Sequence, residues 1–230
     1  GSCKVIINGL KANNYTATIS YVNDKNYAAD SQTISFEVNK KDIEFEVDIN
    51  DINVDEIAKI IVTGLPNDAI GLINVNVDDK SKSNKSSIGQ AIVNIKGLSY
   101  GAKQANVTFT GDDKYNSKTI TKSFNVNKID PSFTVDDISN VFVSDNVEFS
   151  AYLNPDAYGI ISLIMNGENV GEVQFSGGKV DLKITSLTYG NKTLDVVYSG
   201  NDKYLSETIT KSFAVDKIKP DLIVDNPSRI

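Results

Sequence analysis

The sequence has no histidine and no tryptophan, and Cys3 and Arg229 are its only cysteine and its only arginine. Without histidine, the chain lacks the commonest general base, a Cys–His nucleophile and any zinc site that needs histidine. A single cysteine excludes a disulfide within the chain. One arginine leaves little means for a bidentate clamp on a phosphate or carboxylate group. We therefore expect no enzyme.

Long apolar runs and clusters of basic residues are also missing. The net charge of the 230 residues is −7, and no apolar stretch approaches the roughly 20 residues that a membrane-spanning helix needs. Binding to nucleic-acid phosphates requires grouped lysine and arginine side chains. With 40% hydrophobic and 23% charged residues, the composition is typical of folded protein. It predicts neither a nucleic-acid partner nor a membrane segment.

What the sequence has instead is one stretch that comes three times. Residues 187–220 read LTYGNKTLDVVYSGNDKYLSETITKSFAVDKIKP, and residues 98–131 read LSYGAKQANVTFTGDDKYNSKTITKSFNVNKIDP. A third, less similar copy opens the chain. The turn tyrosines of the three copies, Tyr27, Tyr115 and Tyr204, stand 88 and then 89 residues apart. A repeat of this length indicates an array of whole domains, because solenoid units are shorter.

Each repeat consists of short segments in which apolar and polar residues alternate. Val180, Leu182 and Ile184, for example, alternate with Asp181 and Lys183, which is the period of a half-buried strand. About seven such segments occur in each full repeat, separated by turn residues, and no segment has a sustained helical period. The pattern predicts an all-β fold of tandem immunoglobulin-like (Ig-like) antiparallel β-sandwiches.

The repeat also predicts domain boundaries and turns. Asn166-Gly167 is a strong signal for a type I′ hairpin turn. Residues 6–38 are expected to form three strands, and residues 1–40 are expected to be the C-terminal half of an Ig-like domain. The other predicted parts are two complete domains and the first strand of a following repeat or a tail: 41–129, 130–218 and 219–230.

The run GGKVDLKITSLTYGNKTLDVVYSGNDKYLSETITKSFAV at 177–215 resembles the second half of bacterial and archaeal Ig-like repeat domains. The segment LNPDAYGIISLIMNGE at 153–168 resembles the same domains, and the resemblance covers nearly all of 41–218. Such domains are strung in tandem along adhesin-like surface proteins, notably of methanogenic archaea. The resemblance implies an extracellular location at the cell surface and a part in cell adhesion. The resemblance supplies no catalytic residues that could be assigned to this chain. It is weak evidence for function, because a fold does not imply a function.

The repeated turn carries acidic residues, namely Asp112 and Asp113 beside Lys114, and Asp202 beside Lys203. Calcium prefers oxygen ligands of this kind, but it takes about six to eight of them. One turn supplies too few oxygens, and the adjacent lysine adds a competing charge. We expect these acids to form the turn. Calcium is the alternative, and no other cofactor is expected.

Lys122 and Lys211 share strand parity with the predicted core residues Phe124 and Phe213. A lysine on a core face is costly unless it is paired or extends outward to water. Surface fibres elsewhere join such a lysine to an asparagine by an isopeptide bond, which makes both lysines isopeptide candidates. A β-bulge or an outward-extending side chain is the simpler interpretation.

Four Asn-X-Ser/Thr sequons are candidate N-glycosylation sites. Asn106 is expected on the outward side of its strand, and Asn84 and Asn191 are expected in loops. The fourth sequon begins at Asn14. Glycosylation at these sites requires a host that glycosylates its secreted proteins.

Two functional classes fit these observations. Short, proline-containing linkers at 126–131 and 215–220 favour a semi-rigid stalk whose partners are the neighbouring Ig-like domains. The alternative is a module that binds a glycan or protein receptor at the cell surface. It would use the polar segment 78–87, which is predicted to be a flexible loop, and the tyrosines Tyr152 and Tyr158.

A third hypothesis concerns assembly. Residues 1–40 would expose unpaired strand edges, and 220–230 resembles an orphan first strand. Unpaired edges recruit partners, so the tail of one chain would pair head to tail with the half domain of another. An arbitrary start of the sequence within a domain is the simpler explanation.

Overall fold

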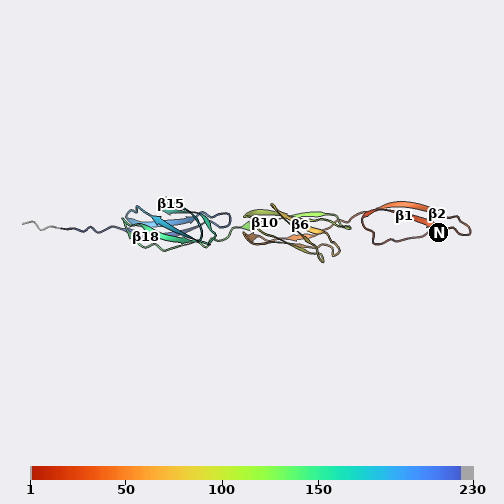
Figure 1. The fold of residues 1–230 in the computed structure, drawn as a ribbon, viewed down its shortest axis with the longest axis horizontal. Coiled ribbons are helices and arrows are strands. Elements are labelled where there is room, and N and C mark those ends of the chain that lie inside the picture. Colours follow the sequence, from red (N-terminus) through yellow and green to blue (C-terminus); the bar gives the residue numbers. More distant parts are fainter. Residues whose placement is uncertain (1, 224–230) are drawn as a thin grey trace, which may run out of the picture. The chain divides into compact units, whose positions relative to one another are not determined.

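The computed structural model describes residues 2–223, which form strands and turns. Among these residues, no helix is long and apolar enough to cross a membrane. The chain divides into two compact units, Gly1–Asn127 and Lys128–Ile230 (Figure 1). The first unit contains a two-stranded hairpin and a sandwich, and the second contains another sandwich. The prediction of an all-β, Ig-like fold is confirmed.

The first sandwich consists of two sheets whose inner faces share one apolar core. Its smaller sheet has the order β3 (Glu46–Asp48), β5 (Ala58–Thr63), β8 (Ala91–Ile95). Its larger sheet has the order β4 (Ile52–Asn53), β10 (Lys118–Asn127), β9 (Gly101–Phe109), β6 (Leu72–Val77), β7 (Lys80–Lys85).

The second sandwich has the same arrangement, again around a core of its own. Its smaller sheet has the order β11 (Thr134–Val135), β13 (Val147–Tyr152), β16 (Lys179–Ile184). Its larger sheet has the order β12 (Val141–Phe142), β18 (Glu207–Asp216), β17 (Gly190–Tyr198), β14 (Tyr158–Met165), β15 (Glu168–Ser176).

The alternating residues of the sequence become the two cores. Along β17, Leu194, Val196 and Tyr198 are fully buried, while the residues between them face outward. Full burial of a large apolar side chain contributes about 1.5–3 kcal/mol before conformational entropy is subtracted. Each sandwich buries many such side chains within its own unit. Each therefore has the apolar interior that an independent domain requires.

The sandwiches differ from the prediction in one respect, because not all of their strand pairs are antiparallel. The two-residue strands β4 and β12 pair in parallel with β10 and β18, the last strands of their sandwiches. Segments of two residues show no alternation that a sequence pattern can reveal. Their pairing comes from the other end of the domain, which local sequence does not encode.

The predicted flexible loop at 78–87 is wrong, because Lys80–Lys85 forms β7 and pairs antiparallel with β6 along its whole length. The turn is made by Asp78, whose φ is 50°, and by Asp79. The strand has no apolar residue because it lies at the sheet edge, where its side chains remain largely exposed. Lysines on an edge strand also discourage pairing with other chains.

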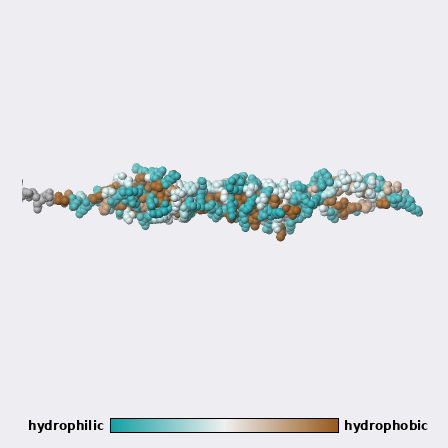
Figure 2. Space-filling model, in the orientation of Figure 1, coloured by the Kyte–Doolittle hydropathy of each residue, from teal (hydrophilic) through white to brown (hydrophobic). Residues whose placement is uncertain are grey.

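The hairpin consists of β1 (Asn13–Tyr21) and β2 (Asp30–Val38). The first of the three strands predicted from Ile6 onward does not form among the described residues. The residues that match β8 are 3–7, and β8 is held by β5 in the first sandwich. The hairpin's Ile19 is 61% exposed, whereas the matching Val107 is fully buried. Figure 2 shows apolar atoms at the surface of this region. Among residues 2–223, the hairpin thus carries the apolar face of a sandwich without a second sheet over it.

The turn between β14 and β15 follows its prediction. Asn166 and Gly167 have φ values of 50° and 90°, both in the left-handed region that a type I′ turn requires. The turn places Asn166 next to β17, where its backbone N–H donates to the Thr193 carbonyl at 2.9 Å.

Candidate functional site

The repeated turn has the same hydrogen bonds in all three copies. In the β9–β10 turn, Asp112 Oδ1 accepts the backbone N–H groups of Lys114 at 2.8 Å and Tyr115 at 2.9 Å. Asn201 does the same in the β17–β18 turn, with Lys203 and Tyr204 both at 2.8 Å. Asp24 repeats the pattern in the hairpin. The side-chain oxygen thus replaces a backbone acceptor, which is the ordinary use of Asp and Asn in turns.

Each complete sandwich ties this turn to a second turn through an aspartate clamp. In the first sandwich, Asp68 accepts from Lys114 Nζ at 2.8 Å and from the Tyr115 hydroxyl at 2.9 Å, one bond on each carboxylate oxygen. In the second, Asp156 accepts from Lys203 Nζ at 2.6 Å and from the Tyr204 hydroxyl. We call these two groups the aspartate clamps. Each clamp holds the loop that joins the smaller sheet to the larger sheet against a hairpin turn of the larger sheet.

The clamps shift the ionisation of their members. The bonds from Lys114 and Tyr115 lower the pKa of the Asp68 carboxyl, because both donors stabilise its charged form. The pKa of Tyr115 is raised, chiefly by its bond to Asp68 and also by burial. For Tyr204, burial raises the pKa most and the bond to Asp156 adds to it. Each clamp is therefore a charge-assisted contact at neutral pH.

The turn acid Asp112 is replaced by Asn201, and the contact to the neighbouring turn changes accordingly. Asp112 Oδ2 accepts the backbone N–H of Ile70 at 2.9 Å. At the matching place, Asn201 Nδ2 donates to the backbone carbonyl of Tyr158 at 3.0 Å. An acceptor facing an N–H has become a donor facing a carbonyl. The link between the two turns is kept in both sandwiches.

A second repeated feature is a parallel seam between the first segment of each sandwich and its last strand. In the first sandwich, the Cα partners are Lys41↔Tyr115, Ile52↔Val126 and Asn53↔Asn127. Side-chain bonds lie between these partners, namely Asp42–Asn116, Glu44–Lys118 and Asp51–Asn125, each joining residues 74 apart. A constant difference in residue number is what two parallel segments produce. The seam bonds lie at the two ends of β10, and between them the first segment pairs with β5 in the smaller sheet as β3.

The second sandwich repeats the seam along β18. Ile129 pairs with Tyr204, and the pair Val141↔Val215 continues the seam at its far end. Between them, Lys211 Nζ donates to Asp137 at 2.7 Å, and the Ala214 N–H donates to Asn140 at 2.9 Å, again with a separation of 74 residues. The seam residues before β4 and β12 were not identified from the sequence. A sequence signal for them existed, because the segments before β4 and β12 occupy equivalent positions in the two repeats.

The two isopeptide candidates do not lie in a closed apolar site. Lys122 is exposed, and Lys211 is half-buried and paired with Asp137, which is fully exposed. The strand register of β10 and β18 is continuous, so no bulge turns either side chain. Lys211 leaves the core face by extending its ammonium group outward, the behaviour expected of a long amphipathic side chain.

The calcium candidates are not brought together in the described part of the chain, where no three His, Cys, Asp or Glu side chains form a metal-binding group. Both oxygens of Asp112 already accept backbone N–H groups. Asp113 pairs with Lys11 at 2.5 Å, and Asp202 is exposed. The geometry places these acids in turn formation and surface pairing, with calcium binding left as a sequence-based alternative.

The four sequon asparagines are all exposed and all lie in strands. The prediction of loops for Asn84 and Asn191 is wrong, because they belong to β7 and β17. Asn84 donates its amide to the carbonyl of Ile92 at 2.8 Å, and Asn106 accepts from the Thr121 hydroxyl at 2.7 Å. Asn14 and Asn191 have exposed side chains and are the second residues of β1 and β17.

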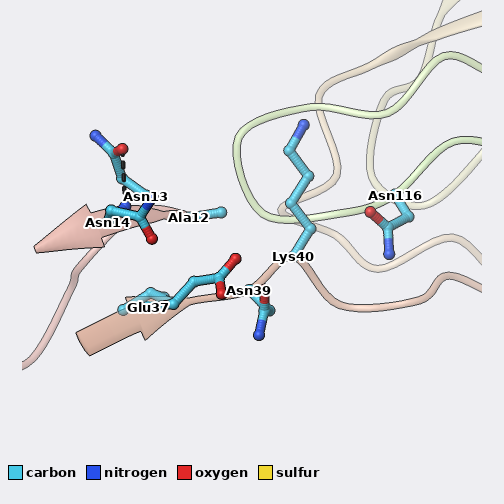
Figure 3. Close-up of a pocket in the computed structure, with 8 residues that line it drawn as sticks. Ala12, Asn13, Asn14, Glu37, Asn39, Lys40 and Asn116 are labelled. Carbon is cyan, nitrogen blue, oxygen red and sulfur yellow. Dashed lines mark hydrogen bonds between the residues drawn. The ribbon is translucent and has the colours of Figure 1, made fainter.

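The residues proposed for ligand binding do not meet in one site. Tyr152 lies on β13 and Tyr158 on β14, which belong to different sheets, and they are 40% and 49% exposed. A hollow of about 510 Å³ in the first unit is lined by polar groups, among them Glu37, Lys40 and Asn116 (Figure 3). It has no aromatic side chain that could stack on a sugar. The hollow therefore offers hydrogen bonds but little apolar contact.

No protein-family model matches the chain, and a search of curated proteins finds no match. Among solved structures, fibronectin(III)-like modules of CbhA from Clostridium thermocellum share 14% identity, with a TM-score of 0.34 and coverage of 80% of this chain and 100% of that one. A Ca²⁺-stabilised adhesin of an Antarctic bacterium that binds ice shares 15% identity, with a TM-score of 0.31 and coverage of 89% and 57%.

A 1.5-MDa bacterial ice-binding adhesin, described for its retention at the host cell surface, shares 13% identity, with a TM-score of 0.31 and coverage of 90% and 74%. These structural neighbours are fibronectin-like modules and adhesin domains. With TM-scores this low, the assignment of the fold rests on the strand order described above.

Proposed function

We propose that this chain is a non-catalytic stalk segment of an extracellular, adhesin-like cell-surface protein, and that its sandwiches transmit mechanical force. The observation that carries the proposal is the parallel seam. The chain enters the first sandwich at Lys41, at one end of the seam, and leaves it at Asn127, at the other end. In the second sandwich the corresponding points are Ile129, where the chain enters, and Asp216, where it leaves.

This geometry determines how tension acts on the hydrogen bonds. Pulling the two ends of a sandwich apart slides two parallel segments past one another, so the seam bonds are loaded together in shear. An antiparallel pair pulled at one end would instead open one bond at a time. Unfolding under force is governed by the unfolding rate. A seam that must break as a unit raises the barrier for that step.

The junctions support the same proposal. Asn127 accepts a bond from Val54 in the first sandwich, and Ile129 donates to Lys203 in the second. Asn127, bonded in one sandwich, and Ile129, bonded in the next, are thus only two positions apart in the sequence. A linker this short leaves little slack for a pulling force to take up.

Single-molecule force spectroscopy on the whole chain tests the proposal. Pulling from the two termini is expected to give two unfolding events, one per sandwich, each lengthening the chain by about 300 Å. The double variant Asp42→Ala/Asp51→Ala should lower the unfolding force of the first sandwich only, because both side chains bond across its seam.

The matched control is Lys59→Ala/Lys96→Ala, which removes two exposed charges of the same sandwich outside the seam. It should leave both unfolding forces unchanged. The proposal fails if the wild-type sandwiches unfold at forces no higher than the seam variant, or if the control weakens the first sandwich as much.

A further inference from the structure

Each sandwich buries one lysine near the start of the central strand of its larger sheet. The two lysines have different hydrogen-bond partners. Lys103 on β9 and Lys192 on β17 occupy matching positions and are 8% and 7% exposed. Lys103 Nζ bonds to Asp78 at 2.7 Å and to the Ser99 hydroxyl at 3.0 Å. For Lys192, the Thr188 hydroxyl at 2.9 Å is the one hydrogen-bond partner among the described residues.

The missing carboxylate can be traced to one position. Ser99 and Thr188 match in the repeat, so the hydroxyl partner is kept. Asp78 matches Asn166, and both residues have a φ of 50° at the start of the turn that follows β6 or β14. A buried ammonium group without a carboxylate is costly. The second sandwich therefore lacks half of an ion pair that the first sandwich has.

Asn166 belongs to one of the two Asn-Gly pairs in the sequence, the other being Asn8-Gly9. An asparagine followed by glycine is prone to deamidation, because the unhindered glycine nitrogen can reach the side-chain amide. Asn166 is exposed, and a side chain built on Gly167 would meet nothing within 4 Å. The Asn166 Oδ1 accepts the Thr193 N–H at 3.0 Å, which polarises the carbonyl that would be attacked.

We propose that Asn166 is a deamidation site, and that its conversion to aspartate completes in the second sandwich the buried Lys–Asp pair already present in the first. Asn166 is tied to Thr193, the neighbour of Lys192, by two hydrogen bonds. Since Asn166 matches Asp78 and Lys192 matches Lys103, a carboxylate at Asn166 takes the place of Asp78 in the repeat. The modification is thus a maturation step that strengthens one end of the second sandwich.

The step is balanced with water as the only co-reactant. The backbone nitrogen of Gly167 bonds to Cγ of Asn166, the Cγ–Nδ2 bond breaks, and ammonia leaves with the proton from the Gly167 nitrogen. Water then opens the cyclic imide. Opening at one carbonyl gives aspartate in the normal backbone, and opening at the other gives isoaspartate. The net change is amide and water to carboxylate and ammonium, a mass gain of about 1 Da.

The first experiment is peptide mapping of the folded, full-length chain during incubation at mildly alkaline pH. Incubation continues until half of Asn8, which lies outside the strands, has deamidated. We expect the peptide that contains Asn166 to gain about 1 Da in the same period, and to gain it more slowly in Lys192→Met, where the cation is removed. If Asn166 stays an amide while Asn8 converts, the modification is disproved.

The second experiment measures hydrogen exchange of the full chain. Asn166→Asp should increase protection in β14 and β17 about 5- to 30-fold, the range that corresponds to a gain of one or two kcal/mol. In the Lys192→Met background this gain should vanish, because the two sites are coupled. Asp78→Asn should reduce protection in β6 and β9 by a similar factor. A gain that persists without Lys192, or no gain at all, overturns the proposed pairing.

Discussion

The two sandwiches differ at two matching polar positions, and the outcomes are opposite. Where Asp112 is replaced by Asn201, the partner also changes from a backbone N–H to a backbone carbonyl, and the link between the two turns survives. Where Asp78 is replaced by Asn166, Lys192 keeps only its hydroxyl partner within the described part of the chain. The two turns at the clamp end are therefore held together by either a carboxylate or an amide side chain. The buried lysine, in contrast, is kept in the second sandwich although the aspartate that pairs with it in the first is absent.

The edge strands make a second contrast. β7 is polar throughout, and its inward positions carry lysines such as Lys82, which faces Val75 across the pair. β15 instead turns Phe175 inward, where its ring centroid lies 5.8 Å from that of Tyr198. The second sandwich thus extends its core to the edge strand. The first guards that edge with charge, a recognised means of preventing edge-to-edge pairing.

The largest predicted effect is the loss in free energy of unfolding when one matching phenylalanine is replaced in each sandwich and in the hairpin. Phe36, Phe124 and Phe213 are matching residues of the three repeats, but Phe124 and Phe213 are about 95% buried and Phe36 is half-buried. Phe124→Ala and Phe213→Ala should each cost about 3–5 kcal/mol, whereas Phe36→Ala should cost less than about 1 kcal/mol. Chemical denaturation, followed by hydrogen exchange of the hairpin and of each sandwich separately, checks this prediction. Equal losses at all three positions would show that a second sheet covers the hairpin in solution.

The next largest effect is the loss in free energy of unfolding when the tyrosine hydroxyl of each aspartate clamp is removed, which tests whether the two clamps are equivalent. Tyr115→Phe and Tyr204→Phe each remove one hydroxyl bond to an aspartate and leave the lysine bond in place. Each should lower the free energy of unfolding by about 0.5–1.5 kcal/mol, with the larger loss at Tyr204, which is 2% exposed compared with 9% for Tyr115. Thermal unfolding of the full-length variants measures both. A larger loss at Tyr115 would mean that burial does not control the strength of the clamp.

Much of this fold was predictable because its information is local and repeated. Alternation along Val180–Ile184 predicts a strand without knowledge of its partner, and Asn166-Gly167 specifies its own turn. The edge strand β7 was missed because an edge position requires no apolar residue. The two-residue strands β4 and β12 were missed because only pairing with a distant strand defines them.

The site residues were harder to predict than the strands. The turn role of Asp112 follows from its own neighbours, but Asp68, the clamp partner of Tyr115, lies 47 residues away from that tyrosine in the sequence. A signal did exist, since Asp68-Ala69 and Asp156-Ala157 recur at the period of the repeat. Polar residues that recur in turns deserve the same weight as recurring apolar residues in strands, because both mark contacts that the fold reuses.

A smaller predicted effect is a loss of stability of the β9–β10 turn at acidic pH. Burial on its own would raise the pKa of Asp112, but the N–H groups of Ile70, Lys114 and Tyr115 outweigh it and lower the pKa. A lowered pKa gives stability that is complete above the unfolded value of about 4 and is lost as the pH falls through the folded value. Exchange protection of the β9–β10 turn should therefore fall in acid. Asp112→Asn should remove part of this dependence. Asn201→Asp should not reproduce it in full in the β17–β18 turn, because one carboxylate oxygen would face the Tyr158 carbonyl instead of an N–H group. An unchanged pH profile in Asp112→Asn would contradict the assignment.

The smallest effect is expected at the matching lysines Lys122 and Lys211. The partner of Lys211, Asp137, is fully exposed, and an exposed ion pair contributes about 0–1 kcal/mol. Lys211→Ala should therefore cost no more than about 1 kcal/mol, and Lys122→Ala, at an exposed position, still less. An isopeptide bond at either lysine would behave differently, because it would lower the intact mass of the wild-type chain by about 17 Da for the ammonia lost, and its removal would cost far more than an exposed pair. Intact mass and thermal unfolding of the two variants separate these cases, and a mass equal to that of the sequence leaves the lysines as outward-extending side chains of the seam.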